Sequence, residues 1–291
     1  MSVQIQQMTV DEFAESRIAL GDRVKKFGTV YWVRKGLFFR PLLPHEACPV
    51  SESDLPSTQI GGFQCVVSVP SEANSVMKFL MLDEVQHYAL DKLKHDRRLL
   101  IKNAAKQFAI RLVQDSNQFK KRGFQVYCSF YERTRYRYKR ERVRRRNYEH
   151  WVDSVLKSRK TLILGGYDQS EELRAISLSY WVADTLSYAS FFADTVALQK
   201  GVGELMFHRL RELASQTPGI HEIFVRRYQG GNGMDKYYLL RGAKLVTKPC
   251  KLQLDPVSKW ILKSCFPARY AKLGERIKGT NAWAQPLDDL F

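Results

Sequence analysis

The chain has 291 residues, of which 44% are hydrophobic and 26% are charged. This composition is typical of globular proteins and excludes a wholly disordered chain, a collagen-like repeat and a coiled-coil rod. Lysine and arginine number 47 against 30 aspartates and glutamates, which gives a formal net charge of +17. Such an excess indicates a partner or substrate that carries negative charge. The length predicts roughly two domains.

The N-terminal part of the chain predicts strands, a proline-rich loop and a basic helix. Residues 1–20 have the pattern of a short helix, with Asp11 as a candidate N-cap. The segment 41–58 contains four prolines and is expected to form a loop. A basic helix is expected over 85–107. Runs of β-branched and aromatic residues predict strands at 29–39, 63–69 and 108–113.

The positive charge is concentrated in the middle of the chain. Residues 92–122 hold ten lysines and arginines against two aspartates, and residues 133–146 hold nine against one glutamate. Because guanidinium groups repel one another unless an anion lies among them, the second run indicates phosphate contacts, although a solvated helix face is the alternative. A helix pair is expected over 130–156. The predicted nucleic-acid-binding residues are Arg137, Arg140, Arg142, Arg144, Arg145 and Arg146.

The second half of the chain predicts a sheet interrupted by two helices. A strand at 161–164 is expected to end at Gly165 and Gly166. Alternating residues then predict a hairpin of 173–181 with 186–193. The apolar stripe after Gly201 predicts a helix that stops at 217–219. The remaining elements are expected to be a strand at 220–226, a short helix at 234–240 and strands at 243–246 and 251–254.

Several classes of site and location are disfavoured by the sequence. The N-terminus has no basic segment followed by an apolar run, and no stretch reaches the ~18 uncharged apolar residues of a membrane helix. We therefore expect a cytoplasmic protein with no membrane span. The five cysteines form no CxxC pair and the six histidines are scattered, so reduced thiols and no metal are expected.

Two motifs in the second half carry a resemblance to a known family. The first is LQKGVGELMFHRL at 198–210, and the second is GGNGMDKYYLLRGAKLV at 230–246. The segment 173–254 that contains them resembles the GNAT superfamily of acyl-CoA N-acyltransferases. The resemblance implies an α/β (α+β) fold with a mixed, mostly antiparallel sheet flanked by helices. It also allows a tandem of a degenerate and a complete GNAT-like domain.

The first motif predicts a phosphate-binding turn. Glycines at the start of a helix that follows a strand let backbone N–H groups approach a phosphate. In the GNAT family this turn holds the pyrophosphate of coenzyme A. The resemblance therefore implies acetyl-CoA or another acyl-CoA as co-substrate, bound by Lys200, Gly201, Val202 and Gly203, with Asn232 as a further contact.

The second motif predicts a proton donor. Tyr238 lies four residues before Gly242, which is the spacing of the family tyrosine that protonates the departing thiolate. A phenol suits this role because it keeps its proton at neutral pH. A carboxylate that removes a proton from the acceptor amine is expected on or beside the central strands. The sequence leaves Asp184, Asp194 and Glu222 as candidates.

A second branch of the same fold is also suggested. The stretch FYERTRYR at 130–137 and the basic segment 97–108 resemble Fem-type peptidyltransferases and aminoacyl-tRNA transferases. That resemblance implies aminoacyl-tRNA as the donor in place of acyl-CoA, with tRNA held by backbone electrostatics along 92–146. The sequence departs from the Fem pattern because the coiled-coil arm of those proteins is missing.

The sequence therefore predicts an N-acyltransferase that moves an acyl group, expected to be acetyl, from acyl-CoA to an amine. The alternatives are an aminoacyl-tRNA-dependent transferase and a nucleic-acid-binding protein on an inactive GNAT scaffold. The amine acceptor is expected to be a small molecule or a protein. The predicted domains are an N-terminal α/β region at 1–125, a GNAT-like domain at 126–255 and a helical tail at 256–291.

Overall fold

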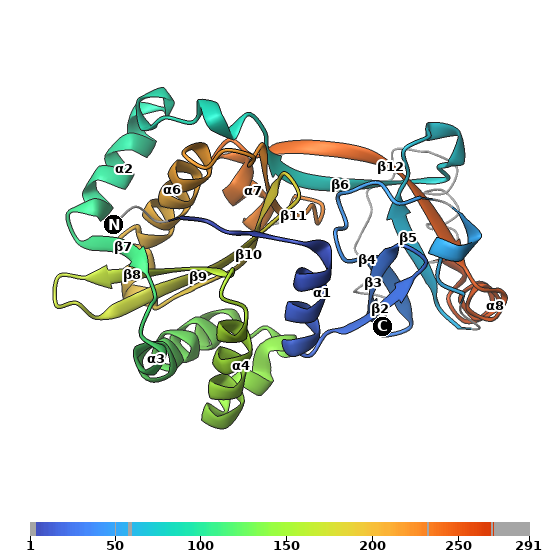
Figure 1. Ribbon diagram of the computed structural model, residues 1–291, viewed down its shortest axis with the longest axis horizontal. Helices are drawn as coiled ribbons and strands as arrows, with labels where there is room; N and C mark the ends of the chain where they lie inside the picture. The colour runs from blue at the N-terminus through green and yellow to red at the C-terminus, as the bar shows by residue number, and fades with distance from the viewer. Residues whose placement is uncertain (1–3, 50, 58–59, 232, 269, 271–291) are drawn as a thin grey trace. The chain divides into compact units, whose positions relative to one another are not determined.

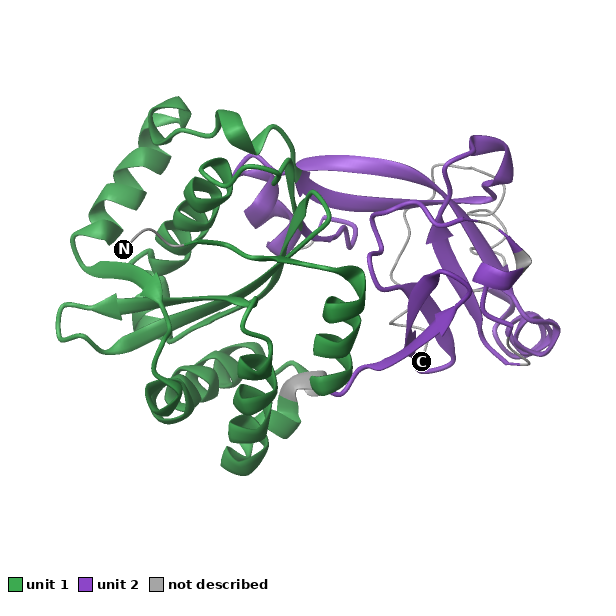
Figure 2. Cartoon of the chain, in the orientation of Figure 1, with its two compact units in different colours: residues 1–20, 82–224 green, residues 21–81, 225–291 purple. Residues whose placement is uncertain are grey.

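A computed structural model describes the chain except for residues 1–3, 50, 58–59, 232, 269 and 271–291 (Figure 1). The chain divides into two compact units, each assembled from two segments (Figure 2). Unit 1 comprises residues 1–20 and 82–224, and unit 2 comprises residues 21–81 and 225–291. These boundaries lie at other positions than 125 and 255. Because compactness alone does not define a domain that folds by itself, the division at 125 and 255 stays a prediction.

Unit 1 is built on a mostly antiparallel sheet. Its strands follow the order β11-β10-β9-β8-β7, and β1 pairs with β9 on a separate path. The β10–β11 and β1–β9 pairs are parallel, and the others are antiparallel. The bounds are β1 Gln7–Met8, β7 Phe108–Leu112, β8 Leu162–Asp168, β9 Leu173–Val182, β10 Thr185–Ala193 and β11 Glu222–Arg227, whose last three residues belong to unit 2.

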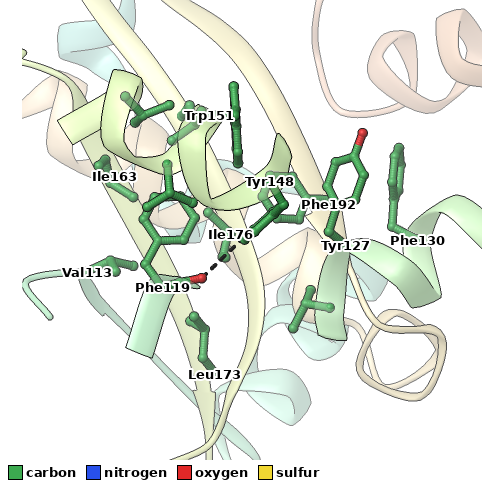
Figure 3. Packing of buried hydrophobic residues seen from close by; sticks show 14 of the residues in the cluster. Val113, Phe119, Tyr127, Phe130, Tyr148, Trp151, Ile163, Leu173, Ile176 and Phe192 are labelled. Atoms are coloured by element: carbon green, nitrogen blue, oxygen red, sulfur yellow. Dashed lines mark hydrogen bonds between the residues drawn. The ribbon is translucent and has the colours of Figure 1, made fainter. Parts of the chain in front are cut away.

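Helices cover both faces of the sheet in unit 1, with α3 and α4 on one side and α2 and α6 on the other (Figure 1). The sheet face that α3 and α4 cover carries a core rich in aromatic residues (Figure 3). In this core the Tyr148 hydroxyl donates to the Phe119 carbonyl at 3.3 Å. The helices are α1 Val10–Ala19, α2 His95–Ala105, α3 Ser116–Thr134, α4 Arg145–Lys157, α5 Thr195–Gln199 and α6 Val202–Ser215, with 3-10 turns η3 Val85–His87, η4 Leu90–Lys92 and η5 Arg137–Val143.

Unit 2 holds a second set of strands in the order β2-β3-β4-β5-β12-β6, in which only β4 and β5 pair in parallel. Its core is formed by Trp32, Phe39, Phe63, Val67 and two buried cysteines, Cys48 and Cys65. The bounds are β2 Arg23–Phe27, β3 Val30–Lys35, β4 Phe38–Pro41, β5 Gly62–Val66, β6 Ser75–Leu82, β12 Lys244–Leu254, η1 Glu52–Asp54, η2 Pro70–Glu72, α7 Gly233–Leu239 and α8 Pro256–Cys265.

The predicted fold class is confirmed, because the sheet is mixed, mostly antiparallel and flanked by helices. Several local predictions are wrong. The N-cap of α1 is Thr9, which forms a capping box with Glu12, and not Asp11. Gly165 and Gly166 lie inside β8. The strand expected at 29–39 is two strands that turn at Gly36, the helix expected at 85–107 is two short turns followed by α2, and the last two strands are the single strand β12.

Candidate functional site

β10 has a partly unpaired edge within the sheet of unit 1. β10 pairs with β9 along its length, but with β11 only from Thr185 to Ser187. A register shift lies between Tyr188 and Ser190, so Ala189 has no partner residue on β9 or β11 among the described strands. A bulge beside an unpaired strand edge turns backbone N–H groups toward the open side. Such donors can stabilise the oxyanion that forms during acyl transfer.

Glu222 and Asp184 meet at the beginning of β10. The Thr185 hydroxyl lies 3.0 Å from a carboxylate oxygen of Asp184 and 3.0 Å from one of Glu222. The backbone N–H of Glu222 also donates to the Asp184 carbonyl at 3.4 Å. Two carboxylates joined by one hydroxyl form a polar group that can accept a proton, directly or through water.

Asp194 lies at the other end of β10 and caps α5. Its carboxylate accepts the N–H of Ala197 at 2.7 Å, and Arg174 lies 3.7 Å from its second oxygen. β10 has nine residues, so Asp194 and Glu222 are separated by roughly 25–30 Å along the strand. The structure therefore does not bring these two predicted bases to one reacting atom, and it gives Asp194 a capping role.

Asp194 and Lys200 line a cavity of about 560 Å³ at the end of the sheet in unit 1. The guanidinium of Arg174 lines this cavity and lies 2.7 Å from Asp168 and 3.2 Å from Glu172. Burial raises the pKa of Asp168, but hydrogen bonds from Arg174 and from backbone N–H groups outweigh burial and lower it. Asp168, Glu172 and Arg174 thus pair with one another, whereas the second carboxylate oxygen of Asp194 is buried with no hydrogen-bond partner among the described residues and the Lys200 side chain is exposed.

The predicted phosphate turn lies between α5 and α6. Gly201 has the left-handed φ of +86° that glycine adopts easily. Val202 is 0% exposed and Gly203 is also buried. Helix α2 covers this turn, since a Cβ on Gly201 would lie 3.4 Å from the Ala104 Cβ. In this arrangement α2 lies against Gly201, so a pyrophosphate at this turn would have to fit beside α2.

An ion pair holds α2 over that turn. Arg97 of α2 donates to Glu204 in the first turn of α6 at 3.0 Å, and both side chains are partly buried. Ile101 and Ala104 are the buried residues on the inner face of α2. The outer face carries the exposed Lys102. α2 therefore combines a thin apolar contact with an outer surface on which Lys102 lies beside the exposed Leu99 and Leu100.

Tyr238 belongs to α7 in unit 2 and is 6% exposed. Its ring packs edge-on against Tyr237, and its carbonyl accepts the N–H of Ala243 at 3.1 Å.

Sequence reasoning missed Asp235, which is fully buried and accepts the N–H groups of Gln229 and Gly231 at 2.8 and 2.9 Å. The signal was an aspartate four residues after a glycine pair, a short-range pattern for a capped turn. The predicted contact Asn232 lies outside the described residues.

The arginine run divides into structural and exposed members. Arg142 lies over the Trp151 ring at 4.6 Å, and burial lowers its pKa. Arg145 pairs with Glu149 at 2.9 Å. Nothing is described of the Arg137 side chain. Arg140, Arg144 and Arg146 are exposed and have no ion pair with any residue that the structure describes. These three arginines are called the exposed arginine set below.

Two absences hold for the described part of the chain. No cluster of three histidine, cysteine or acidic side chains there is suited to hold a metal ion. Within the same ranges, every helix is too short or too polar to cross a bilayer.

Comparison with solved structures places the fold. The C-terminal domain of a protein from Agrobacterium fabrum assigned as a lysylphosphatidylglycerol synthetase matches with a TM-score of 0.58 and 11% identity, over 89% of this chain and 93% of that one. L-PGS from Bacillus licheniformis matches with a TM-score of 0.56 and 11% identity, over 91% and 92%. FemX matches with a TM-score of 0.58 and 7% identity, over 87% and 92%.

These likenesses extend over almost the whole chain and show that it has a GNAT-like fold, which it shares with FemX. At such low identity they show the fold alone. No protein-family model matches the sequence, and no curated protein sequence matches it.

Proposed function

We propose that this protein is an acyltransferase that moves an aminoacyl group from aminoacyl-tRNA to an amine. The open, bulged edge of β10 carries the proposal, because an acyl transfer needs donors for a developing oxyanion. The choice of donor is supported by the burial of the Gly201–Gly203 turn under α2. The chain shares its fold with FemX and with a protein named for the synthesis of lysylphosphatidylglycerol. Lysylphosphatidylglycerol is an aminoacyl ester, so this likeness agrees with an aminoacyl donor.

The proposed reaction has one addition and one elimination. The acceptor amine adds to the carbonyl carbon of the aminoacyl ester, and the Ala189 region of β10 hydrogen-bonds to the resulting oxyanion. The C–O bond to the ribose then breaks, and an amide forms. The amine loses one proton and the ribose oxygen gains one. Glu222 and Asp184 lie roughly 13 Å along β10 from Ala189, so they would receive the amine proton through intervening water molecules. Asp194 is the weaker candidate base because its carboxylate caps α5.

Tyr238 stays the proposed proton donor for the leaving oxygen. A buried phenol retains its proton at neutral pH and can give it to a stronger base such as an alkoxide. Tyr238→Phe keeps the ring and deletes only the hydroxyl. This variant therefore tests the role of the hydroxyl whichever molecule supplies the acyl group.

The proposed tRNA surface combines the exposed arginine set with Lys102 on the outer face of α2. Both belong to unit 1, and both lie within the basic segment 92–146. Arginines that form no ion pair with a described residue can bind phosphates bidentately. Contacts of this kind hold the RNA backbone without reading its sequence.

Acyl-CoA remains the second candidate donor on one specific observation. Gly201, in the left-handed conformation, is the N-cap of the 14-residue helix α6. The first N–H groups of a helix have no partner within it and can bind a phosphate. Use of this turn would require α2 to move away. Under this alternative acetyl-CoA binds saturably in calorimetry, whereas the proposed function predicts no such binding.

The deciding experiment uses the full-length protein, freed of nucleic acid, with a pool of tRNAs charged with labelled amino acids. We expect labelled product when a peptide or another primary amine is supplied, and none when acetyl-CoA replaces the charged tRNA. Ala189→Pro removes one edge N–H at a bulge, where proline is tolerated, and should abolish transfer while tRNA binding persists. Ala189→Val is the matched control. Saturable acetyl-CoA binding without transfer from tRNA would refute the proposal.

A further inference from the structure

Helix α8 of unit 2 is held in a defined orientation by its inner side. Asp255 caps it by accepting the N–H of Ser258 at 2.9 Å, and the Ser258 hydroxyl accepts the N–H of Gly61 at 2.6 Å. Leu262 is buried with Phe38 and Leu252. Because both ends of the inner face are anchored, the side chains on the opposite face have a fixed direction.

The outer side of α8 is apolar where a surface helix is normally polar. Val257, Trp260 and Ile261 follow the i, i+3, i+4 spacing of one helix face, and all three are exposed. Trp260 is 65% exposed. Most tryptophans lie largely inside a protein. An exposed tryptophan beside two exposed aliphatic residues therefore marks an interaction surface.

Two lysines border this apolar stripe. Lys259 and Lys263 are exposed, lie one turn apart and face the same side of α8. Pro256–Cys265 contains no aspartate or glutamate, so the surface is positively charged as well as apolar. A helix with tryptophan and aliphatic residues on one side and lysines beside them is typical of segments that lie in a membrane interface.

We propose that the outer face of α8 docks on an anionic lipid surface, with Val257, Trp260 and Ile261 inserted between the lipids and Lys259 and Lys263 on the headgroups. Charge complementarity favours this occupant. A second copy of the chain would bring identical lysines together, which is unfavourable. RNA offers the matching charge, but bases stack on rings and gain little from Val257 and Ile261. This proposal does not depend on the proposed transferase activity.

The test is sedimentation of the full chain with vesicles of phosphatidylcholine alone and of an equimolar mixture with phosphatidylglycerol. We expect binding to the mixed vesicles only. Trp260→Ser combined with Ile261→Ser should weaken it by about tenfold or more, since two inserted side chains are lost. Lys259→Glu with Lys263→Glu should weaken it comparably. Leu99→Ser with Leu100→Ser, an equally exposed apolar pair on α2, is the matched control and should have no effect.

A second readout keeps the proposal open to refutation if a variant folds poorly. Lipids brominated near the headgroup should quench part of the tryptophan emission of the wild type, and Trp260→Phe should remove that part while vesicle binding persists. Equal binding of the wild type and of the Trp260→Ser, Ile261→Ser variant to mixed vesicles would overturn the proposal. The positive charge of the protein would then account for the vesicle binding without insertion of side chains. A double variant that loses tRNA binding and keeps vesicle binding would overturn it in favour of RNA.

Discussion

The arginine run offers the sharpest separation of structural from binding residues. Replacing the exposed arginine set by alanine removes three side chains that have no ion pair with a described residue. Replacing Arg142 removes a guanidinium that lies 4.6 Å over the Trp151 ring. The two variants differ by only two charges, yet we expect opposite outcomes. The triple variant should lose RNA affinity and keep its stability, and Arg142→Ala should do the reverse.

The size of both effects follows from the contacts. Each phosphate contact contributes about 0.7–0.9 to the slope of log affinity against log salt, so the triple variant should have a slope shallower by about 2–3. Arg142→Ala loses a partly buried cation–π contact together with the packing of its stem, a loss of about 1–2 kcal/mol in the free energy of unfolding. For a chain of this size, that loss lowers the melting temperature by several degrees, at about 2–4 °C per kcal/mol.

The assay is fluorescence anisotropy of labelled tRNA over a series of salt concentrations, together with thermal unfolding of each variant. Arg23→Ala with Lys25→Ala, which neutralises two exposed residues of β2 in unit 2, controls for the general loss of charge. An unchanged salt slope in the triple variant would show that these arginines are a solvated surface. An Arg142→Ala protein with normal stability and weakened RNA binding would refute the division of the run.

Three further predictions concern packing, acid stability and catalysis. Gly123→Ala should destabilise unit 1 by about 1–3 kcal/mol, measured by urea unfolding, because the new Cβ would collide with the Tyr148 hydroxyl and lie 2.9 Å from the Phe119 ring. Hydrogen bonds from Ser51 and Thr29 hold the pKa of Asp54 below its usual range. That stabilisation is present above the unfolded value of about 3.9 and is lost as pH falls through the lower folded value, so Asp54→Asn should flatten the acid limb of stability. Tyr238→Phe should lower kcat and leave donor affinity unchanged, and an unaltered kcat would exclude Tyr238 as the proton donor.

The elements that depend on local patterns were predicted well. The hairpin of β9 and β10 shows alternation over two long strands joined by a tight turn, and both strands occur where expected. The helix expected after Gly201 is α6. The break at Gly36 was missed because both flanking segments are rich in β-branched and aromatic residues, so composition does not distinguish one strand from two.

The candidate site depended on contacts that local patterns do not reveal. Arg142 looks like its neighbours in the sequence, and only its position above Trp151 makes it structural. Asp194 was expected as a base because it follows a central strand. Its carboxylate is instead used by the first turn of α5. The bulge at Ala189 has no composition signal, since the strand around it alternates like any other.

The cover over the Gly201–Gly203 turn has a consequence for the donor that can be given a magnitude. Moving α2 away would break the Arg97–Glu204 ion pair and expose Ile101 to water. A largely buried aliphatic side chain contributes about 1.5–3 kcal/mol and such an ion pair up to about 1 kcal/mol, so opening costs about 2–4 kcal/mol. A ligand that needs the open turn would bind roughly thirtyfold to several hundredfold more weakly than to a preformed site. Under the proposed function, a donor held by the exposed arginine set and the outer face of α2 would bind without this opening of α2.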